Sequence, residues 1–445
     1  MRTEASPRRQ ADVAGWIVLS GNLLPKNKTQ PSADVLAERG EAVKDSGWRV
    51  ALKWGFGAAL AHRLLLGIWM ASVWITISSW TTYDADFDAT RMDGLPRLST
   101  PAAQVIFGVW RRWDANHYLS LAVHGYQPEN PGPTVFGVLT PLAFQFLDRA
   151  LPGPVDLGAM VFETLAFGLA LTLLFRLCVV DYGDGQLAHW AVGVAVLQPL
   201  SYVFAAPLSE SAYLALALGA VYAAYRERWL LAALCGLLAT LARIQGVLLA
   251  VVVGLILLST TRARQGGVRE MVRRGWSLIL IPLGGLLFLG FRSIQGLPSL
   301  GNVYAHHSYL VYADPFSSLF FNARHFVRQW PHSLYDADLL TLAVSLALGV
   351  LMLRYPRHRR LPMVAYTWMH LLLFLSKVNL TQGTQEVTYS QSFGRYALVL
   401  FPLTIMVADG LRQIRSERVR FACVVGGSLL LLVFSARHVL YLIGP

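Results

Sequence analysis

Long apolar runs separated by short polar loops make up the chain from about residue 55 to its end. A run of about 20 mostly apolar residues crosses a bilayer as one helix, so we expect membrane helices here. About eleven runs qualify, and they cover 55–79, 158–180, 188–206, 211–225, 229–243, 246–260, 276–291, 337–353, 362–378, 396–411 and 421–441. The pattern therefore predicts an all-α polytopic membrane protein.

The first part of the chain differs from the rest. Residues 1–53 are polar, basic and interrupted by prolines. Such a segment buries too little apolar surface to offset the entropy lost on folding. We therefore expect a largely disordered cytoplasmic tail at 1–53 and a transmembrane domain at 54–445.

Composition agrees with the membrane class and excludes an ordinary soluble protein. The chain is 55% hydrophobic and only 14% charged, whereas a soluble domain has about 25% charged residues. The net charge of +12 does not indicate a nucleic-acid partner, because the basic residues cluster in short loops between apolar runs.

These basic loops predict an orientation. They hold Arg226, Arg228, Arg262, Arg264, Arg269, Arg273, Arg274, Arg354, Arg357, Arg359, Arg360, Arg412, Arg415, Arg418 and Arg420. Cytoplasmic loops carry such an excess, so we expect the N-terminus in the cytoplasm and the protein in the plasma (inner) membrane. Three longer segments, 80–157, 292–336 and 379–393, then lie on the extracytoplasmic face.

Two predicted helices, 229–243 and 246–260, are short for a full span and meet at Arg243-Ile244-Gln245-Gly246. Broken helices at membrane depth are tolerated where they line a cavity. The break therefore predicts a cavity with Arg243 at its outer end.

A polar island in the first outer segment carries the strongest candidate for chemistry. It reads Trp110-Arg111-Arg112-Trp113-Asp114-Ala115-Asn116-His117-Tyr118. Helical spacing places Asp114, His117 and Tyr118 on one face, and the aromatic residues suit the membrane interface. Asp114 either presents a carboxylate to a substrate or caps an interfacial helix; the residues alone leave both open.

Three further charged residues interrupt apolar surroundings. We expect Ser209 to cap a predicted helix that opens with Glu210. Glu210 is there either a functional candidate or a carboxylate simply favoured by the helix dipole. Arg243 and Arg395 suit the binding of a phosphate, because guanidinium makes paired hydrogen bonds. The alternative for both arginines is an ion pair between helices or snorkelling to the interface. We expect Lys377 to be a snorkelling anchor.

The chain lacks a P-loop, a GxGxxG motif and a soluble nucleotide-binding domain. A sugar carried on a lipid phosphate fits such a protein better than a nucleotide sugar. We expect no cofactor and no obligatory metal, because no cluster of ligands is evident in the sequence.

At these residues the chain resembles the PIG-V family of GPI mannosyltransferases, in its bacterial branch, within the GT-C membrane glycosyltransferases. The family's Trp-Asp followed by an aromatic and Gly-Tyr looks like Trp113-Asp114 through Gly125-Tyr126, with Glu129 close behind. Its other motifs look like Ser209-Glu210, Arg243-Ile244-Gln245-Gly246, and Arg395-Tyr396 with Phe401-Pro402. One departure is Phe136-Gly137-Val138-Leu139-Thr140-Pro141, where the family has Phe-Phe-Pro-Leu-Tyr-Pro.

The resemblance implies a GT-C-like bundle that transfers mannose, with inversion, from polyprenyl-phosphate-mannose to a glycolipid or glycan hydroxyl. It implies Asp114 as the catalytic base, with His117, Tyr118 and Glu210 in support and Arg243 and Arg395 at the donor phosphate. Two alternatives stay open: a GT-C transferase of another lipid-linked sugar, such as arabinose or glucose, and a non-catalytic transporter or scaffold.

Overall fold

The computed structural model describes residues 33–77, 94–307, 310–380 and 387–440. The chain divides into a small unit, Met1–Gly47, and a large unit, Trp48–Pro445. Helix α1 (Ala33–Ile77) begins well before the first predicted span. Residues 33–53 of the predicted tail belong to this helix, and helix-forming residues such as Ala, Leu, Glu and Lys are frequent there. The rest of the predicted tail, 1–32, lies outside the described residues.

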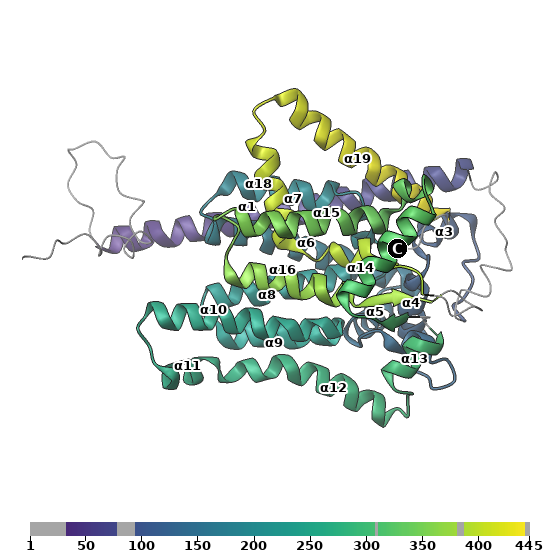
Figure 1. Cartoon of the computed structure of the whole chain (residues 1–445), viewed down its shortest axis with the longest axis horizontal. Helices are drawn as coiled ribbons and strands as arrows, with labels where there is room; N and C mark the ends of the chain where they lie inside the picture. The colour runs from purple at the N-terminus through teal and green to yellow at the C-terminus, as the bar shows by residue number, and fades with distance from the viewer. Residues whose placement is uncertain (1–32, 78–93, 308–309, 381–386, 441–445) are drawn as a thin grey trace, which may run out of the picture. The chain divides into compact units, whose positions relative to one another are not determined.

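The large unit consists almost entirely of helices (Figure 1). After α1 its helices of eight or more residues are α4 (Asp114–His124), α5 (Leu139–Ala150), α6 (Val155–Asp181), α7 (Gly185–Leu197), α8 (Glu210–Tyr225), α9 (Trp229–Ala242), α10 (Leu249–Ala263), α11 (Val268–Gly275), α12 (Leu280–Ile294), α13 (Leu300–His307), α14 (Pro315–Arg328), α15 (Ala337–Arg354), α16 (Leu361–Leu375), α18 (Phe401–Gln413) and α19 (Glu417–Val439). Two short helices, α3 (Pro101–Ile106) and α17 (Phe393–Ala397), lie in connecting segments. Strands β1 (Leu310–Tyr312) and β2 (Lys377–Asn379) pair antiparallel.

Within the described residues, six helical segments are long and apolar enough to cross a membrane. They are Gly47–Ile77, Val155–Asp181, Ile244–Ala263, Val268–Ile294, Ala337–Arg354 and Glu417–Val439. The predicted class of an all-α membrane protein is confirmed at this level.

Several helices end earlier than the apolar pattern predicts. The predicted helix 188–206 ends at Leu197, because Gln198 precedes a proline and adopts an extended backbone. The predicted helix 362–378 ends at Leu375, and Lys377 belongs to β2 instead. The predicted helix 396–411 is divided into α17 and α18, which begins at Phe401 with a proline in its first turn.

The predicted break near Arg243 is present. Helix α9 ends at Ala242, Arg243 is extended, and a 3-10 turn over Ile244–Leu248 leads into α10. Gly246 permits this close turn, since a Cβ there would lie 2.4 Å from the Thr240 nitrogen.

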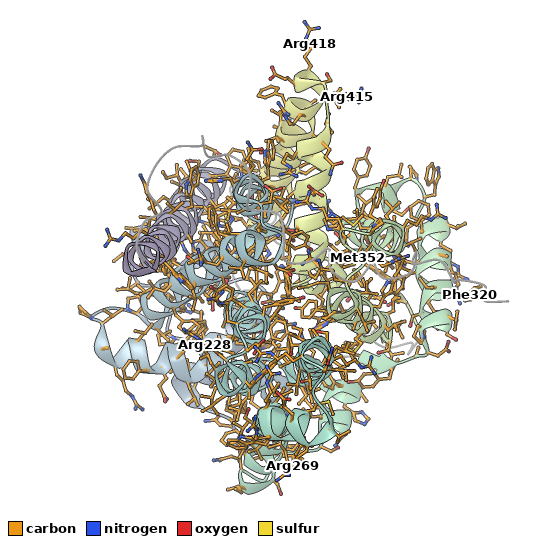
Figure 2. All side chains as sticks on the ribbon, turned by 90° about the vertical axis from the view of Figure 1, so that its left-hand side faces the viewer. Arg228, Arg269, Phe320, Met352, Arg415 and Arg418 are labelled. Atoms are coloured by element: carbon orange, nitrogen blue, oxygen red, sulfur yellow. The ribbon has the colours of Figure 1, made fainter. Side chains whose placement is uncertain are left out.

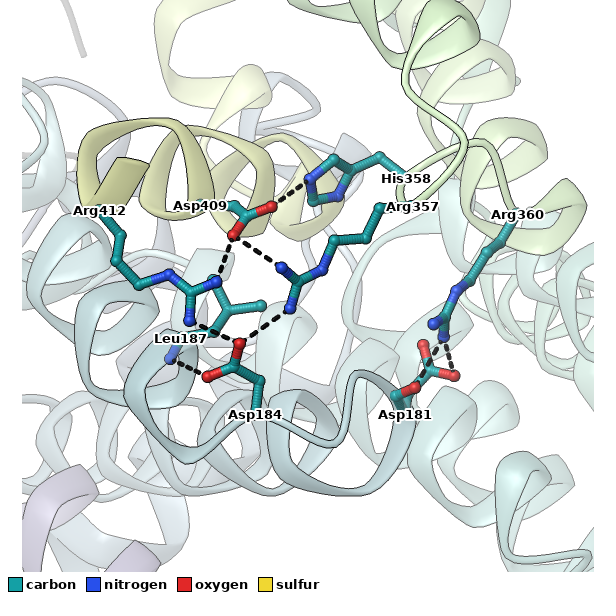
Figure 3. A network of polar contacts seen from close by, with 8 residues as sticks. All are labelled: Asp181, Asp184, Leu187, Arg357, His358, Arg360, Asp409 and Arg412. Carbon is teal, nitrogen blue, oxygen red and sulfur yellow. Dashed lines mark hydrogen bonds and ion pairs between the residues drawn. The ribbon is translucent and has the colours of Figure 1, made fainter. Parts of the chain in front are cut away.

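The basic loops gather at one end of the bundle, where Arg228, Arg269, Arg415 and Arg418 face the viewer in Figure 2. A polar network joins two connections and one helix at this end (Figure 3). Asp184 accepts hydrogen bonds from Arg357 at 2.9 Å and from Arg412 at 2.5 Å. Asp409 accepts from the same two arginines and contacts His358 at 3.0 Å. The network therefore joins the α6–α7 turn, the α15–α16 loop and α18.

Replacing Asp409 by asparagine is expected to lower the free energy of unfolding by about 2–4 kcal/mol, because both arginines lose a buried anionic partner. Thermal unfolding of the purified protein in detergent measures the effect. The control is Glu417→Gln, since Glu417 is exposed and, within the described part of the chain, pairs only with Arg420 at 3.6 Å. Equal melting temperatures for the two variants would contradict the structural role of the network.

Candidate active site

The segment before α4 is fixed by two buried arginines. Arg111 makes a bidentate ion pair with Asp156 at the start of α6, with distances of 2.7 and 2.6 Å. Arg112 donates to the Val439 carbonyl at the end of α19 at 2.9 Å. Trp113 then takes a positive φ of 54° and Asp114 opens α4. Asp114 is the first helical residue, and no side-chain capping bond forms at this helix start; the capping interpretation is therefore wrong.

Asp114 belongs to a chain of alternating charges. Arg395 donates from Nη1 to Asp114 Oδ2 at 2.5 Å and from Nε to Glu210. Arg243 donates to the same oxygen of Glu210. The structure thus brings together four residues that the sequence separates by up to 281 positions.

Ser209 and Tyr118 complete this cluster. Ser209 precedes α8, where the sequence predicts it as a helix cap, yet its side chain makes no capping bond. Its hydroxyl instead bonds the Tyr118 hydroxyl at 2.6 Å and accepts from Arg243 at 3.0 Å. The capping prediction for Ser209 is therefore wrong, because stronger polar partners from α4 and α9 occupy its side chain.

A cavity of about 770 Å³ opens beside the cluster. Asp114, His117, Tyr118, Arg243 and Arg395 line it, and Glu210 does not. The Asp114 side chain is 34% exposed and that of Arg243 is 9% exposed, whereas Arg395 and Glu210 are 1% and 0% exposed. Asp114 is therefore the accessible carboxylate of the cluster, and Glu210 lies behind the wall.

The cavity lies at the end of the bundle away from the basic loops. Helix α8 starts at this cluster with Glu210 and runs to Arg226, and α9 returns from Arg228 to Arg243. Helix α15 likewise starts beside the cavity and ends at Arg354. This arrangement agrees with the predicted separation of the site from the basic loops.

The charges around Asp114 determine its ionisation. Burial alone would raise the pKa of the Asp114 carboxyl, but the adjacent Arg395, with smaller contributions from His117 and Arg243, holds that pKa below its usual value. Asp114 is therefore an anion at neutral pH. Its Oδ1 makes no hydrogen bond with the described residues, so one oxygen stays available to the cavity.

Lys377 is a cavity residue, which corrects the prediction of a snorkelling anchor. The pairing of β1 with β2 takes it out of the helix and into the cavity wall. Its ammonium lies 5.9 Å from the Tyr304 ring centre and 5.3 Å from that of Tyr396. Burial lowers the pKa of Lys377 to about 8, and the positive charges of Arg243 and Arg395 contribute.

Asp338 is a second residue that sequence reasoning missed. Its carboxylate accepts from the backbone nitrogens of Ser392 at 2.7 Å and Gly394 at 2.8 Å, immediately before Arg395. It therefore positions the short helix that carries Arg395. Asp338 lies in the first turn of α15, where the helix dipole alone favours a carboxylate. The sequence therefore contains no specific signal of its contact with the segment before Arg395.

The segment that departs from the family pattern forms part of the cavity wall. Phe136 packs against the rings of Tyr118 and His117, with centroid distances of 4.6 and 5.9 Å. Gly137 lies so close to the end of α9 that a Cβ would be 2.4 Å from the Leu241 and Ala242 oxygens. Within the described residues, no group of three potential ligands gathers to hold a metal ion.

Comparison with known proteins adds no further identification. No protein-family model matches the chain, and no curated protein matches it either. The resemblance to the PIG-V family therefore stays a prediction, and the chemistry of the site has to carry the functional proposal.

Proposed function

We propose that this protein is a glycosyltransferase that moves mannose from polyprenyl-phosphate-mannose to a hydroxyl of an extracytoplasmic glycolipid or glycan. The observation that carries the proposal is the Asp114 carboxylate, which is ionised and faces a cavity of about 770 Å³ with Arg243 and Lys377 in its wall. The cavity thus offers a base and, beside it, cations for a phosphate.

In the proposed reaction Asp114 Oδ1 accepts the proton of the acceptor hydroxyl while that oxygen attacks the anomeric carbon. The new bond forms as the bond from this carbon to the phosphate oxygen breaks, and polyprenyl phosphate leaves with the electron pair. A single displacement inverts the anomeric centre, so a β-linked donor gives an α-mannoside. Polyprenyl phosphate is a good leaving group, so the protein needs no nucleophile of its own.

The two arginines have different roles in this proposal. Arg395 is 1% exposed, and two of its nitrogens are already bound to carboxylates. It is best suited to positioning Asp114 and keeping it ionised. The donor phosphate is instead bound by Arg243, whose Nε and Nη2 make no bond to the described residues, and by Lys377. Cations there offset the charge that develops on the leaving group.

Two alternatives predict different behaviour. A GT-C transferase of arabinose or glucose uses the same base and cations, so only the donor sugar distinguishes it. A non-catalytic transporter or scaffold does not need the Asp114 carboxylate as a base, so replacing it should leave that function intact.

Asp114→Asn is expected to reduce mannose transfer by at least about a hundredfold, because a positioned general base contributes at least that much. The assay uses purified protein, labelled polyprenyl-phosphate-mannose and a lipid extract as the source of acceptors. Parallel assays with labelled arabinosyl and glucosyl donors test the second sugar class.

The control for this variant is Glu129→Gln, which removes an exposed carboxylate in the same outer segment but outside the cavity. Its transfer rate should equal that of the wild type. Equal transfer by a folded Asp114→Asn protein would rule out the proposed base.

Lys377 should make donor use depend on pH. The Lys377 side chain is protonated and positively charged below its pKa of about 8, and this charge is lost as pH rises through that value. We therefore expect kcat/KM for the donor to fall on the alkaline side of about pH 8, since this ratio reports the pKa values of the free enzyme.

Lys377→Arg keeps the charge and should remove this alkaline fall. Lys377→Gln should lower kcat/KM roughly tenfold below pH 8, because one charge-assisted hydrogen bond is lost. An unchanged alkaline fall in Lys377→Arg would assign the titration to another group.

A further inference from the structure

Helix α14 has two faces of opposite character. When each residue turns the helix by about 100°, Phe316, Phe320 and Val327 fall within about 40° of one another. They are 83%, 63% and 72% exposed. Ala323 lies in the same stripe and is also exposed. Ser318, Asn322 and His325 fall on the opposite side of the helix.

The polar face of α14, with Ser318, Asn322 and His325, contacts a loop that lines the cavity. Asn322 donates to the Ser390 hydroxyl at 3.0 Å and accepts from the Ser390 nitrogen at 3.2 Å. His325 stacks on Tyr389, with ring centroids 3.9 Å apart. Tyr389 and Gln391, on either side of Ser390, line the cavity. Helix α14 therefore fixes one part of the cavity wall, and its apolar stripe faces away from that wall.

Figure 2 looks along the membrane-spanning helices, many of which appear end-on. Helix α14 appears side-on in this view, and Phe320 lies at the edge of the molecule. The helix therefore runs across the direction of the spans, as an interfacial helix does, and its stripe points away from the bundle.

The basic residues of α14 lie beside the stripe. Arg324 and Arg328 follow Phe320 by four and eight residues, which places them along one flank of the apolar face. An apolar stripe bordered by arginines matches the boundary between acyl chains and lipid phosphates. A patch of large apolar side chains of this kind marks an interaction surface.

We propose that α14 is a membrane-surface helix that inserts Phe316, Phe320 and Val327 into the lipid leaflet on the cavity side of the bundle. The occupant of this face is the bilayer itself, with which the spanning helices are already in contact. Through Asn322 and His325, the same helix holds this part of the cavity wall at the level of the lipid headgroups, where a substrate with a lipid tail would arrive. The membrane contact does not depend on the proposed transferase activity.

The test measures where the stripe lies in a vesicle. The full chain is prepared with Cys423→Ser and Cys235→Ser, which leaves the buried Cys178 in place. Phe320→Cys or Val327→Cys is added, labelled with an environment-sensitive fluorophore and reconstituted in vesicles of phosphatidylcholine and phosphatidylglycerol. Gln329→Cys is the matched control, since Gln329 is exposed at the end of the same helix but points to the other side.

Two quenchers then separate the outcomes: a nitroxide attached to lipid acyl chains, and iodide in the aqueous phase. The proposal expects severalfold stronger nitroxide quenching at Phe320→Cys and Val327→Cys than at Gln329→Cys, and the reverse order for iodide. Strong iodide quenching at all three positions would place the stripe in water and overturn the proposal. Protection of the two stripe positions from both quenchers would also overturn it, because a protein would then cover the face. None of these outcomes depends on mannose transfer, so failure of the transferase proposal remains distinguishable.

Discussion

The arrangement of the site depends on one buried carboxylate shared by two guanidinium groups. Glu210 is fully buried and accepts hydrogen bonds from both Arg243 and Arg395. An unpaired charge at this depth would be strongly destabilising, so the pairs have to form together. Because Arg395 also binds Asp114, the starts of α4 and α8, the end of α9 and the short helix α17 converge on one place.

The same charges explain why helices break around the cavity. Helix α9 stops at Ala242, α16 stops at Leu375, and α17 is separated from α18 by a few non-helical residues. Free backbone groups within a bilayer are tolerated only where they line a polar cavity or lie inside protein. The breaks after α9 and α16 let Arg243 and Lys377 leave the helix surface and reach the cavity.

The features that the sequence predicts best are the long apolar helices, which the bilayer requires. The runs 158–180, 211–225 and 337–353 agree within three residues with α6, α8 and α15, because long apolar stretches have few other structures available. Asp114, Arg243 and Arg395 were identifiable because charge amid apolar sequence is costly. The inward position of Lys377 was not identifiable from the sequence, since it requires pairing between two three-residue strands that lie far apart in the chain. Nothing near Lys377 in the sequence signals that pairing.

Asp114 and Glu210 show how one cluster gives two carboxylates different roles. Both contact Arg395 and both are held as anions, so charge alone does not separate them. Accessibility does: Glu210 is enclosed by two arginines, whereas Asp114 has one oxygen on Arg395 and the other toward the cavity. A base must reach the proton that it accepts. Of these two carboxylates Asp114 satisfies this condition, and the enclosure of Glu210 between Arg243 and Arg395 keeps Arg395 in place beside Asp114.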